Sequence, residues 1–336
     1  MNATHDTAPL RDLRIDIMKG LLVVGMLASH VNVFYGKPSV ATTVLKYYVN
    51  SISFSGFLFC FGYAVYVAYM RRYTRTTPLR ILSGAAKIFA VFVLSSSTYS
   101  IFRDKTYGWE RFLDILTVQY IPLYNEFLLS FALYYVLTII LVEPFRWATA
   151  NWQRVLGVIV LCCIPTIVPS PFTGLVGSIV WGVPGQYLFP ILPYAPFFLI
   201  GMVFARQTSI PQPWLWGVAI CATLISAAYL MVAQATPQRF PPSIWWLLGP
   251  VLPLTMYYVL SGSALLQQSA FGRWLAHIGE NVLFYLLMSN VLLFAFTRMK
   301  YGFSVLQSMV VTIGMLGIIW LLTSIVRPTS MARQRD

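Results

Sequence analysis

Ten apolar runs of roughly membrane-spanning length divide most of this sequence. They cover residues 17–35, 51–70, 80–99, 118–142, 154–169, 188–205, 213–232, 244–262, 278–297 and 303–325. One transmembrane helix requires about 20 consecutive apolar residues. Because only 10% of the residues are charged and 58% are hydrophobic, an ordinary soluble protein is excluded. The sequence therefore predicts an all-α, polytopic integral membrane protein with about ten transmembrane helices.

The distribution of Lys and Arg predicts the orientation of these helices. If the N-terminus lies in the cytoplasm, fourteen of the 23 basic residues fall in cytoplasmic segments and eight in outer loops. Because cytoplasmic loops carry the excess of positive charge, both termini are expected inside. The net charge of +13 then reflects topology and contact with phospholipids, since no nucleic-acid-binding motif accompanies it. We expect one domain over residues 1–336, with short polar tails at about 1–13 and 327–336.

The first apolar run closes on His30, eleven residues after Lys19. A rise of about 16 Å along one helix carries His30 into the outer half of the bilayer. An ionisable group at that depth indicates function by default. The only other histidines, His5 and His277, are expected too far away to share a metal ion, so no metal site is predicted. Two interpretations remain: a core histidine hydrogen-bonded to a neighbouring helix, or a general base.

Arginines gather in the predicted cytoplasmic turn between the second and third helices. Arg72 and Arg75 are three residues apart, Arg80 follows, and Lys87 lies two turns further into the third helix. Paired arginines suit bidentate binding of phosphate groups. A positive-inside loop explains the same arginines without any ligand. Both interpretations stay open on the sequence alone.

Two carboxylates accompany these cations. Asp16 and Lys19 are spaced i, i+3, so they can pair on one helix face, whereas Lys19 can also extend to the membrane interface. Glu126 is predicted inside the fourth helix, about eight residues from its outer end and at a depth similar to His30. We expect Glu126 to orient the imidazole, to pair with a base elsewhere in the chain, or to line a wet outer cavity.

Two short motifs resemble the signatures of membrane acyltransferase family 3. The stretch "DIMKGLLVVGMLASH" (16–30) has an acidic residue, a base and a histidine at the family's spacing, and "RYTRTTP" (72–78) is similar to its RxxR motif. "FLFCFGYAVY" and "PFFLIGMVFAR" resemble other helices of the family, and "RDLRID" and "YIPLYNEFLL" resemble the branch that succinylates periplasmic glucans. Lys19 stands where Arg is more common. "IGENVLFYLLMSN" (278–290) lacks a histidine that many members have, so no catalytic residue is assigned there.

The resemblance implies transfer of an acetyl or succinyl group from cytoplasmic acyl-coenzyme A. Of the two donors, acetyl-coenzyme A is the one we expect. The acceptor would be a hydroxyl of a glycan or related component of the cell envelope, and the enzyme would lie in a bacterial inner membrane. His30 would act as general base or nucleophile, assisted by Glu126. The donor would be bound by the cationic residues Lys19, Arg72, Arg75, Arg80 and Lys87, supported by Asp16. The residues alone also fit a proton-coupled transporter or flippase, although no inverted repeat is visible.

Overall fold

The computed structural model describes residues 12–207, 212–297 and 302–326, and these residues are mostly helical. Within these ranges there is no β-strand, only two isolated bridges, so the predicted all-α class is confirmed. Most of the predicted tails, residues 1–11 and 327–336, lies outside the described residues. The elements are α1 (Leu13–Tyr35), α2 (Val40–Val65), η1 (Tyr66–Met70), α3 (Thr77–Tyr99), η2 (Ser100–Asp104), α4 (Trp109–Leu116), α5 (Glu126–Ile140), α6 (Val142–Ala148), α7 (Trp152–Cys162), η3 (Ile164–Thr166), α8 (Gly174–Val180), α9 (Ile191–Gln207), α10 (Pro213–Ala233), α11 (Ile244–Leu248), α12 (Val251–Ser261), α13 (Ala264–Gln268), α14 (Ala270–Glu280), α15 (Val282–Ala295) and α16 (Val305–Val326).

Six helical segments of the described residues are long and apolar enough to cross a membrane. They are Leu13–Tyr35, Val40–Met70, Thr77–Asp104, Pro213–Ala233, Ile244–Ser261 and Val305–Val326. Two pairs, α5 with α6 and α14 with α15, pass the same test together but are bent by 89° and 82°. The structure therefore supports a multi-pass membrane protein with six to eight candidate spans among the described residues, and the predicted count of about ten is not confirmed. The segments around α7 and α9 are apolar but shorter than a full span.

The predicted span 118–142 differs most from the structure. Residues 117–125 connect α4 to α5, and α5 begins only at Glu126. Pro122 has no backbone N–H, and Val118 and Tyr124 have positive φ angles of 61° and 73°, so a helix cannot run through this connection. Hydropathy alone does not report these breaks. Glu126 therefore lies in the first turn of α5 and not eight residues inside a helix.

A second difference lies at Asn281, where the predicted span 278–297 breaks. Helix α14 begins well before this span, at Ala270, and the chain bends by 82° between α14 and α15. Asn281 Nδ2 donates a hydrogen bond of 3.0 Å to the carbonyl oxygen of His277. This bond satisfies one of the carbonyl groups that the end of α14 leaves without a helical partner. The chain turns here and does not continue as one straight helix.

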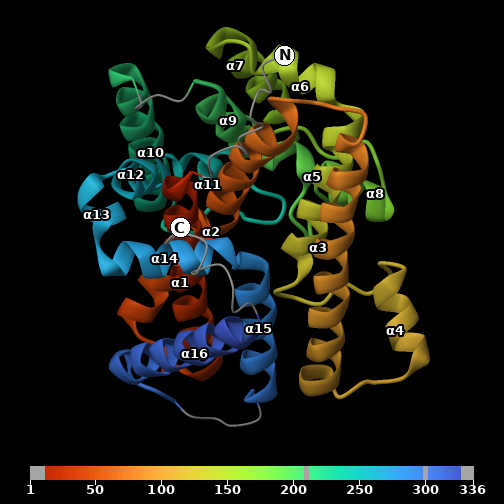
Figure 1. Ribbon diagram of the computed structural model, residues 1–336, viewed down its shortest axis with the longest axis vertical. Coiled ribbons are helices and arrows are strands. Elements are labelled where there is room, and N and C mark those ends of the chain that lie inside the picture. Colours follow the sequence, from red (N-terminus) through yellow and green to blue (C-terminus); the bar gives the residue numbers. More distant parts are fainter. Residues whose placement is uncertain (1–11, 208–211, 298–301, 327–336) are drawn as a thin grey trace, which may run out of the picture.

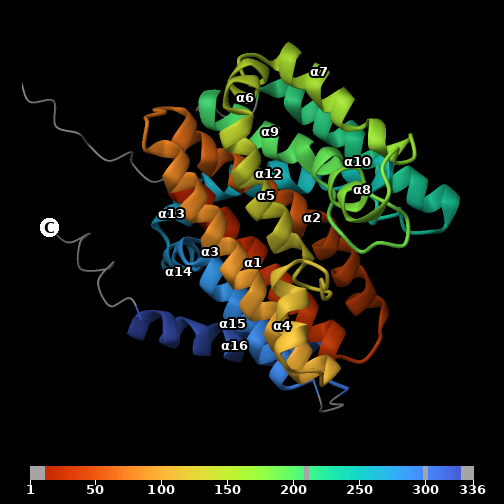
Figure 2. The ribbon, with the colours of Figure 1, turned by 90° about the vertical axis from the view of Figure 1, so that its right-hand side faces the viewer.

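Helix α1 lies inside the bundle, in contact with α2, α12, α14, α15 and α16 (Figures 1 and 2). A Cβ atom added at Gly20 would collide with the backbone of Leu275, and one added at Gly279 would collide with the backbone of Asp16. Glycine at both positions therefore lets α1 and α14 pack backbone to backbone, as small residues do between membrane helices. This crossing holds the part of α1 that carries Asp16 and Lys19.

The remaining long helices pack around α1 and α2. Helix α2 packs on α9, and α3 packs on α5 and α15. Figure 1 shows α3 as the long orange helix along one side, with α4 standing beside its last turns, and α16 crossing the lower end of α1 and α15. This arrangement brings the second half of α1, the middle of α2 and the start of α5 together, where the candidate site lies.

Candidate active site

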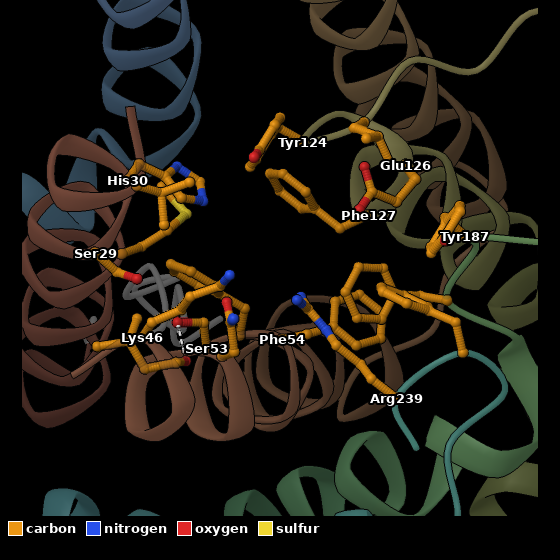
Figure 3. A pocket seen from close by; sticks show the side chains of 18 residues that line it. Ser29, His30, Lys46, Ser53, Phe54, Tyr124, Glu126, Phe127, Tyr187 and Arg239 are labelled. Carbon is orange, nitrogen blue, oxygen red and sulfur yellow. Dashed lines mark hydrogen bonds between the residues drawn. The ribbon is translucent and has the colours of Figure 1, made fainter. Parts of the chain in front are cut away.

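A cavity of about 220 Å³ opens between α1, α2 and the start of α5. The connections at residues 117–125, 181–190 and 234–243 close its other sides. We call it the His30 cavity (Figure 3). The polar side chains that line it are Ser29, His30, Lys46, Asn50, Ser53, Tyr124, Glu126, Tyr187 and Arg239. The structure thus brings the two predicted catalytic residues, His30 and Glu126, to one cavity.

His30 projects from α1 into this cavity (Figure 3). Its Nδ1 atom is buried and has no hydrogen-bond partner among the described residues. The ring meets Tyr124 edge to face, with centroids 5.2 Å apart and an interplanar angle of 81°. A histidine kept only for packing would be expected to satisfy its buried nitrogen. The buried nitrogen of His30 does not meet this expectation, and the general-base interpretation stays a prediction.

Glu126 faces the same cavity from the first turn of α5. The residue is only 7% exposed, and its Oε2 atom is buried with no hydrogen-bond partner among the described residues. In the part of the chain that the structure describes, Glu126 and His30 share no hydrogen bond, and Nδ1 of His30 has no partner. The predicted orienting role would thus require a bridging water or substrate group.

A buried polar network holds the residue next to Glu126. Ser95 Oγ on α3 donates to Asn125 Oδ1 at 2.5 Å, and Asn290 Nδ2 on α15 donates to the same oxygen at 2.9 Å. Asn290 also donates to Ser95 Oγ at 2.9 Å. Three segments far apart in the sequence therefore fix the start of α5. Asn290 is the last residue of the late segment 278–290, in which the sequence analysis assigns no catalytic residue.

Arg239 is the main residue of this cavity that the sequence did not identify. It lies in the connection between α10 and α11, and its guanidinium points into the cavity opposite Glu126 (Figure 3). Burial lowers the pKa of Arg239, and the nearby Tyr194 and Glu126 oppose this effect. The only signal in the sequence is one basic residue among prolines and aromatics, which matches no motif.

A second cavity of about 290 Å³ lies along the same helices, and we call it the Lys19 cavity. Lys19 and Lys87 line it together with mostly apolar side chains. Lys19 Nζ forms an ion pair of 2.6 Å with Asp16, whose side chain is 4% exposed. The predicted pairing of Asp16 with Lys19 is therefore present. The structure also brings Lys87 of α3 to the same cavity, although the two lysines are far apart in sequence.

Phe57 of α2 lines both cavities. Its side chain is buried, with the residue 6% exposed. Lys19 and His30 belong to one helix, so both cavities lie beside α1, and Phe57 is common to their linings. The distance along α1 between Lys19 and His30 is about 16 Å. A ligand that occupied both cavities would therefore pass this ring.

The predicted phosphate-binding arginines lie apart from both cavities. Arg72 and Arg75 are exposed in the turn between η1 and α3, and Arg80 is exposed on the first turns of α3. None of the three lines the His30 cavity or the Lys19 cavity. Seven residues of α3 separate Arg80 from Lys87, a rise of about 10 Å. Donor binding by this turn stays a prediction.

The described residues contain no group of three or more His, Cys, Asp or Glu side chains placed to hold a metal ion. The chemistry that these residues can perform is proton transfer by His30 and electrostatic binding by the surrounding cations. Such a site in an all-helical, multi-pass protein fits a membrane enzyme that acts on polar substrates, and it also fits a transporter of such substrates. Comparison with known proteins identifies the family to which the chain belongs.

A family model described as an acyltransferase domain, that of acyltransferase family 3, matches residues 12–324. Because the match covers almost the whole chain, the protein belongs to the membrane acyltransferase family 3, as the two motifs indicated. No curated protein and no solved structure gives a significant match. The family favours an acyltransferase over the transporter or flippase that the charged residues alone would allow.

Proposed function

We propose that this protein moves an acetyl or succinyl group from cytoplasmic acyl-coenzyme A to a hydroxyl of an extracytoplasmic glycan or related envelope acceptor. The observation that carries the proposal is the pair of cavities along α1, one with Lys19 and one with His30, that share the side chain of Phe57. Such an arrangement suits a donor that enters on one side and an acceptor that enters on the other. The site draws on residues from 16 to 239, which fits one domain.

The donor would bind along the cationic half of this path. Arg72, Arg75 and Arg80 would contact the phosphates of coenzyme A, since guanidinium groups match phosphate oxygens well. Lys19 and Lys87 would contact the polar groups of the pantetheine arm in the Lys19 cavity. Asp16 keeps the ammonium of Lys19 in place through its ion pair. The thioester would then pass Phe57 and reach His30.

The chemical step would take place in the His30 cavity. His30 would accept the proton of the acceptor hydroxyl while the hydroxyl oxygen attacks the thioester carbonyl carbon. The carbon–sulfur bond breaks, the new ester forms, and coenzyme A leaves as a thiolate that takes up a proton. Alternatively, His30 attacks first and carries the acyl group before the acceptor does. Glu126 would accept a hydrogen bond from the acceptor or, through water, from the imidazole.

The enzyme would lie in a bacterial inner membrane with both termini in the cytoplasm. This orientation rests on the excess of Lys and Arg in the predicted cytoplasmic segments. It places the arginine turn on the side where acyl-coenzyme A is available and the His30 cavity toward the outside.

Mass analysis of cell-envelope glycans with and without the protein tests this proposal. We expect an acyl group on the glycans only when the active protein is present, and glycans of identical mass in both samples would contradict the proposed acceptor. Incubation of purified protein with acetyl-coenzyme A, without acceptor, separates the two mechanisms. A mass increase of one acetyl group that His30→Ala abolishes indicates the acyl-enzyme route, whereas an unmodified protein indicates direct transfer.

A further inference from the structure

The guanidinium of Arg239 has no hydrogen-bond partner among the described residues, although it is largely enclosed. Its Nε atom is buried with no hydrogen-bond partner among the described residues. The residue as a whole keeps part of its surface, and it lines the His30 cavity. Leaving a buried donor of a charged group unsatisfied is costly, so a partner from outside the chain is expected to complete it.

Aromatic rings hold this group without using its hydrogen-bond donors. The guanidinium carbon lies 4.9 Å from the ring centre of Phe189 and 4.8 Å from that of Phe240. Cation–π contacts stabilise the charge through the ring faces and leave the N–H groups free. The five N–H donors of arginine form a planar fork that matches a carboxylate in two parallel bonds.

The backbone around Arg239 is fixed before any ligand binds. Tyr194 Oη donates to the carbonyl oxygen of Arg239 at 3.3 Å, and the backbone N–H of Ser243 donates to the carbonyl oxygen of Gln238 at 2.9 Å. Tyr194 is itself buried, with 1% of its surface exposed. A preorganised cation of this kind binds an anion without first ordering its own loop.

The charges that line the His30 cavity do not balance within the described chain. Arg239 and, at the exposed rim, Lys46 contribute two positive charges, and Glu126 is the only carboxylate of the lining. Glu126 and Arg239 form no ion pair, because Glu126 Oε2 and Arg239 Nε each lack a partner and neither residue has a salt bridge among the described residues. The lining therefore carries more cationic than anionic side chains, and the planar fork of Arg239 matches the two oxygens of a carboxylate.

We propose that Arg239 is a specificity-determining residue that binds a carboxylate of one of the two substrates in the His30 cavity. The inference rests on the proposed acyl transfer and narrows its substrates. The carboxylate belongs either to a dicarboxylic acyl group on the donor or to an acidic sugar of the acceptor. In both cases the bound carboxylate holds the reacting group of that substrate next to His30.

Binding to purified full-length protein in lipid nanodiscs tests this inference in two arms. The donor arm compares S-(3-carboxypropyl)-coenzyme A with S-butyl-coenzyme A, and the acceptor arm compares methyl glucuronide with methyl glucoside. We expect the parent to prefer the acid by roughly 10- to 100-fold in one arm, which identifies the source of the carboxylate. Equal affinities for acid and neutral probe in both arms overturn the inference.

Substitutions then assign the preference to Arg239. Arg239→Gln is expected to bring the ratio of acid to neutral affinity close to one, and Arg239→Lys, which keeps the charge but loses the fork, to lower it several-fold. The matched control is Arg103→Gln, because Arg103 is an exposed arginine of η2 that does not line the cavity. A parental ratio in either Arg239 variant overturns the inference, and Arg239→Lys decides alone if Arg239→Gln does not fold.

The two arms also separate this inference from the proposed function. If neither coenzyme A derivative binds the parent, the proposed acyl transfer from coenzyme A fails. The glucuronide arm still measures carboxylate binding at Arg239 in that case. Conversely, both coenzyme A derivatives could bind tightly with equal affinity while the two sugars also bind equally. This result supports coenzyme A as the donor and overturns the proposed carboxylate binding at Arg239.

Discussion

The His30 cavity and the Lys19 cavity follow the same helix but treat their charged groups in opposite ways. In the Lys19 cavity the ammonium of Lys19 is paired with Asp16 at 2.6 Å. In the His30 cavity, His30 Nδ1, Glu126 Oε2 and Arg239 Nε are all buried without a partner among the described residues. The first arrangement keeps a cation in place, and the second leaves polar atoms available to substrates.

This difference indicates a division of labour along α1. Groups that only hold a ligand gain from a fixed partner, since the partner restricts the side chain to one position. Groups that exchange protons or bind the reacting part of a substrate need free donors and acceptors. The comparison therefore predicts that substitution of His30 affects the rate of transfer, whereas substitutions near the Lys19 cavity affect binding of the donor.

Removing the imidazole gives the largest expected effect. His30→Ala should lower the rate of coenzyme A release, measured with an envelope glycan extract as acceptor, by about 10²- to 10⁴-fold, as expected for loss of a general base. The melting temperature should change little, because Nδ1 of His30 has no partner to lose. His277→Ala is the matched control, since His277 lines neither cavity. Parental activity in His30→Ala would contradict the proposed role of His30 as general base or nucleophile.

Removing the charge of Lys19 gives the next largest effect. Lys19→Gln should weaken the affinity for acetyl-coenzyme A by roughly tenfold, the loss typical of one charge-assisted contact, and should leave Asp16 buried without its cation. Lys19→Arg keeps the charge and should retain most of the affinity. Calorimetry with the purified variants measures both. Unchanged donor affinity in Lys19→Gln would mean that Lys19 only anchors α1.

The arginine turn should give a smaller effect per residue. Because Arg72 and Arg75 are exposed, water screens each contact to a phosphate, and each Ala substitution should weaken coenzyme A binding by about three- to tenfold. Arg71→Ala provides the control, since Arg71 belongs to the same exposed turn but not to the RxxR spacing. Equal affinities in all three variants would leave the turn as a determinant of orientation only.

The network at the start of α5 should give the smallest effect. Asn290→Leu removes both hydrogen bonds that Asn290 donates to Ser95 and Asn125, so the position of Glu126 should become less well defined. We expect a fall in kcat of about two- to fivefold with unchanged donor affinity, since this contact acts only through a neighbour. Ser289→Ala is the control, because Ser289 Oγ bonds only within its own helix. A change in donor affinity without a change in kcat would contradict this positioning role.

The sequence predicts those parts of the site that lie on one helix. The spacing of Asp16, Lys19 and His30 is a local property of α1, and the structure places all three as that spacing requires. Arg239 is different, because it reaches the cavity from a connection 209 residues away and belongs to no motif. Contacts between distant segments, such as the hydrogen bond from Tyr194 of α9 to the carbonyl oxygen of Arg239, hold this connection beside the cavity.

A sequence-based prediction is limited in a similar way for the number of membrane spans. Hydropathy identifies apolar residues but does not register a bend between two apolar helices. The bends after Ile140 and at Asn281 lie at the edges of the predicted runs 118–142 and 278–297, and the helices at 152–166 and 191–207 are apolar but shorter than a full span. The late start of α5 follows from Pro122 and from the backbone of Tyr124. These local breaks move Glu126 to a helix start, where its carboxylate faces the cavity.

The most direct test of the path along α1 is a cryo-electron microscopy structure of the protein with S-butyl-coenzyme A. We predict phosphates at the turn 71–76, the pantetheine arm in the Lys19 cavity, and the butyl chain past Phe57 on the side of His30. A butyl chain that ends in a cavity without His30, or phosphates on the side of Arg239, would contradict the account.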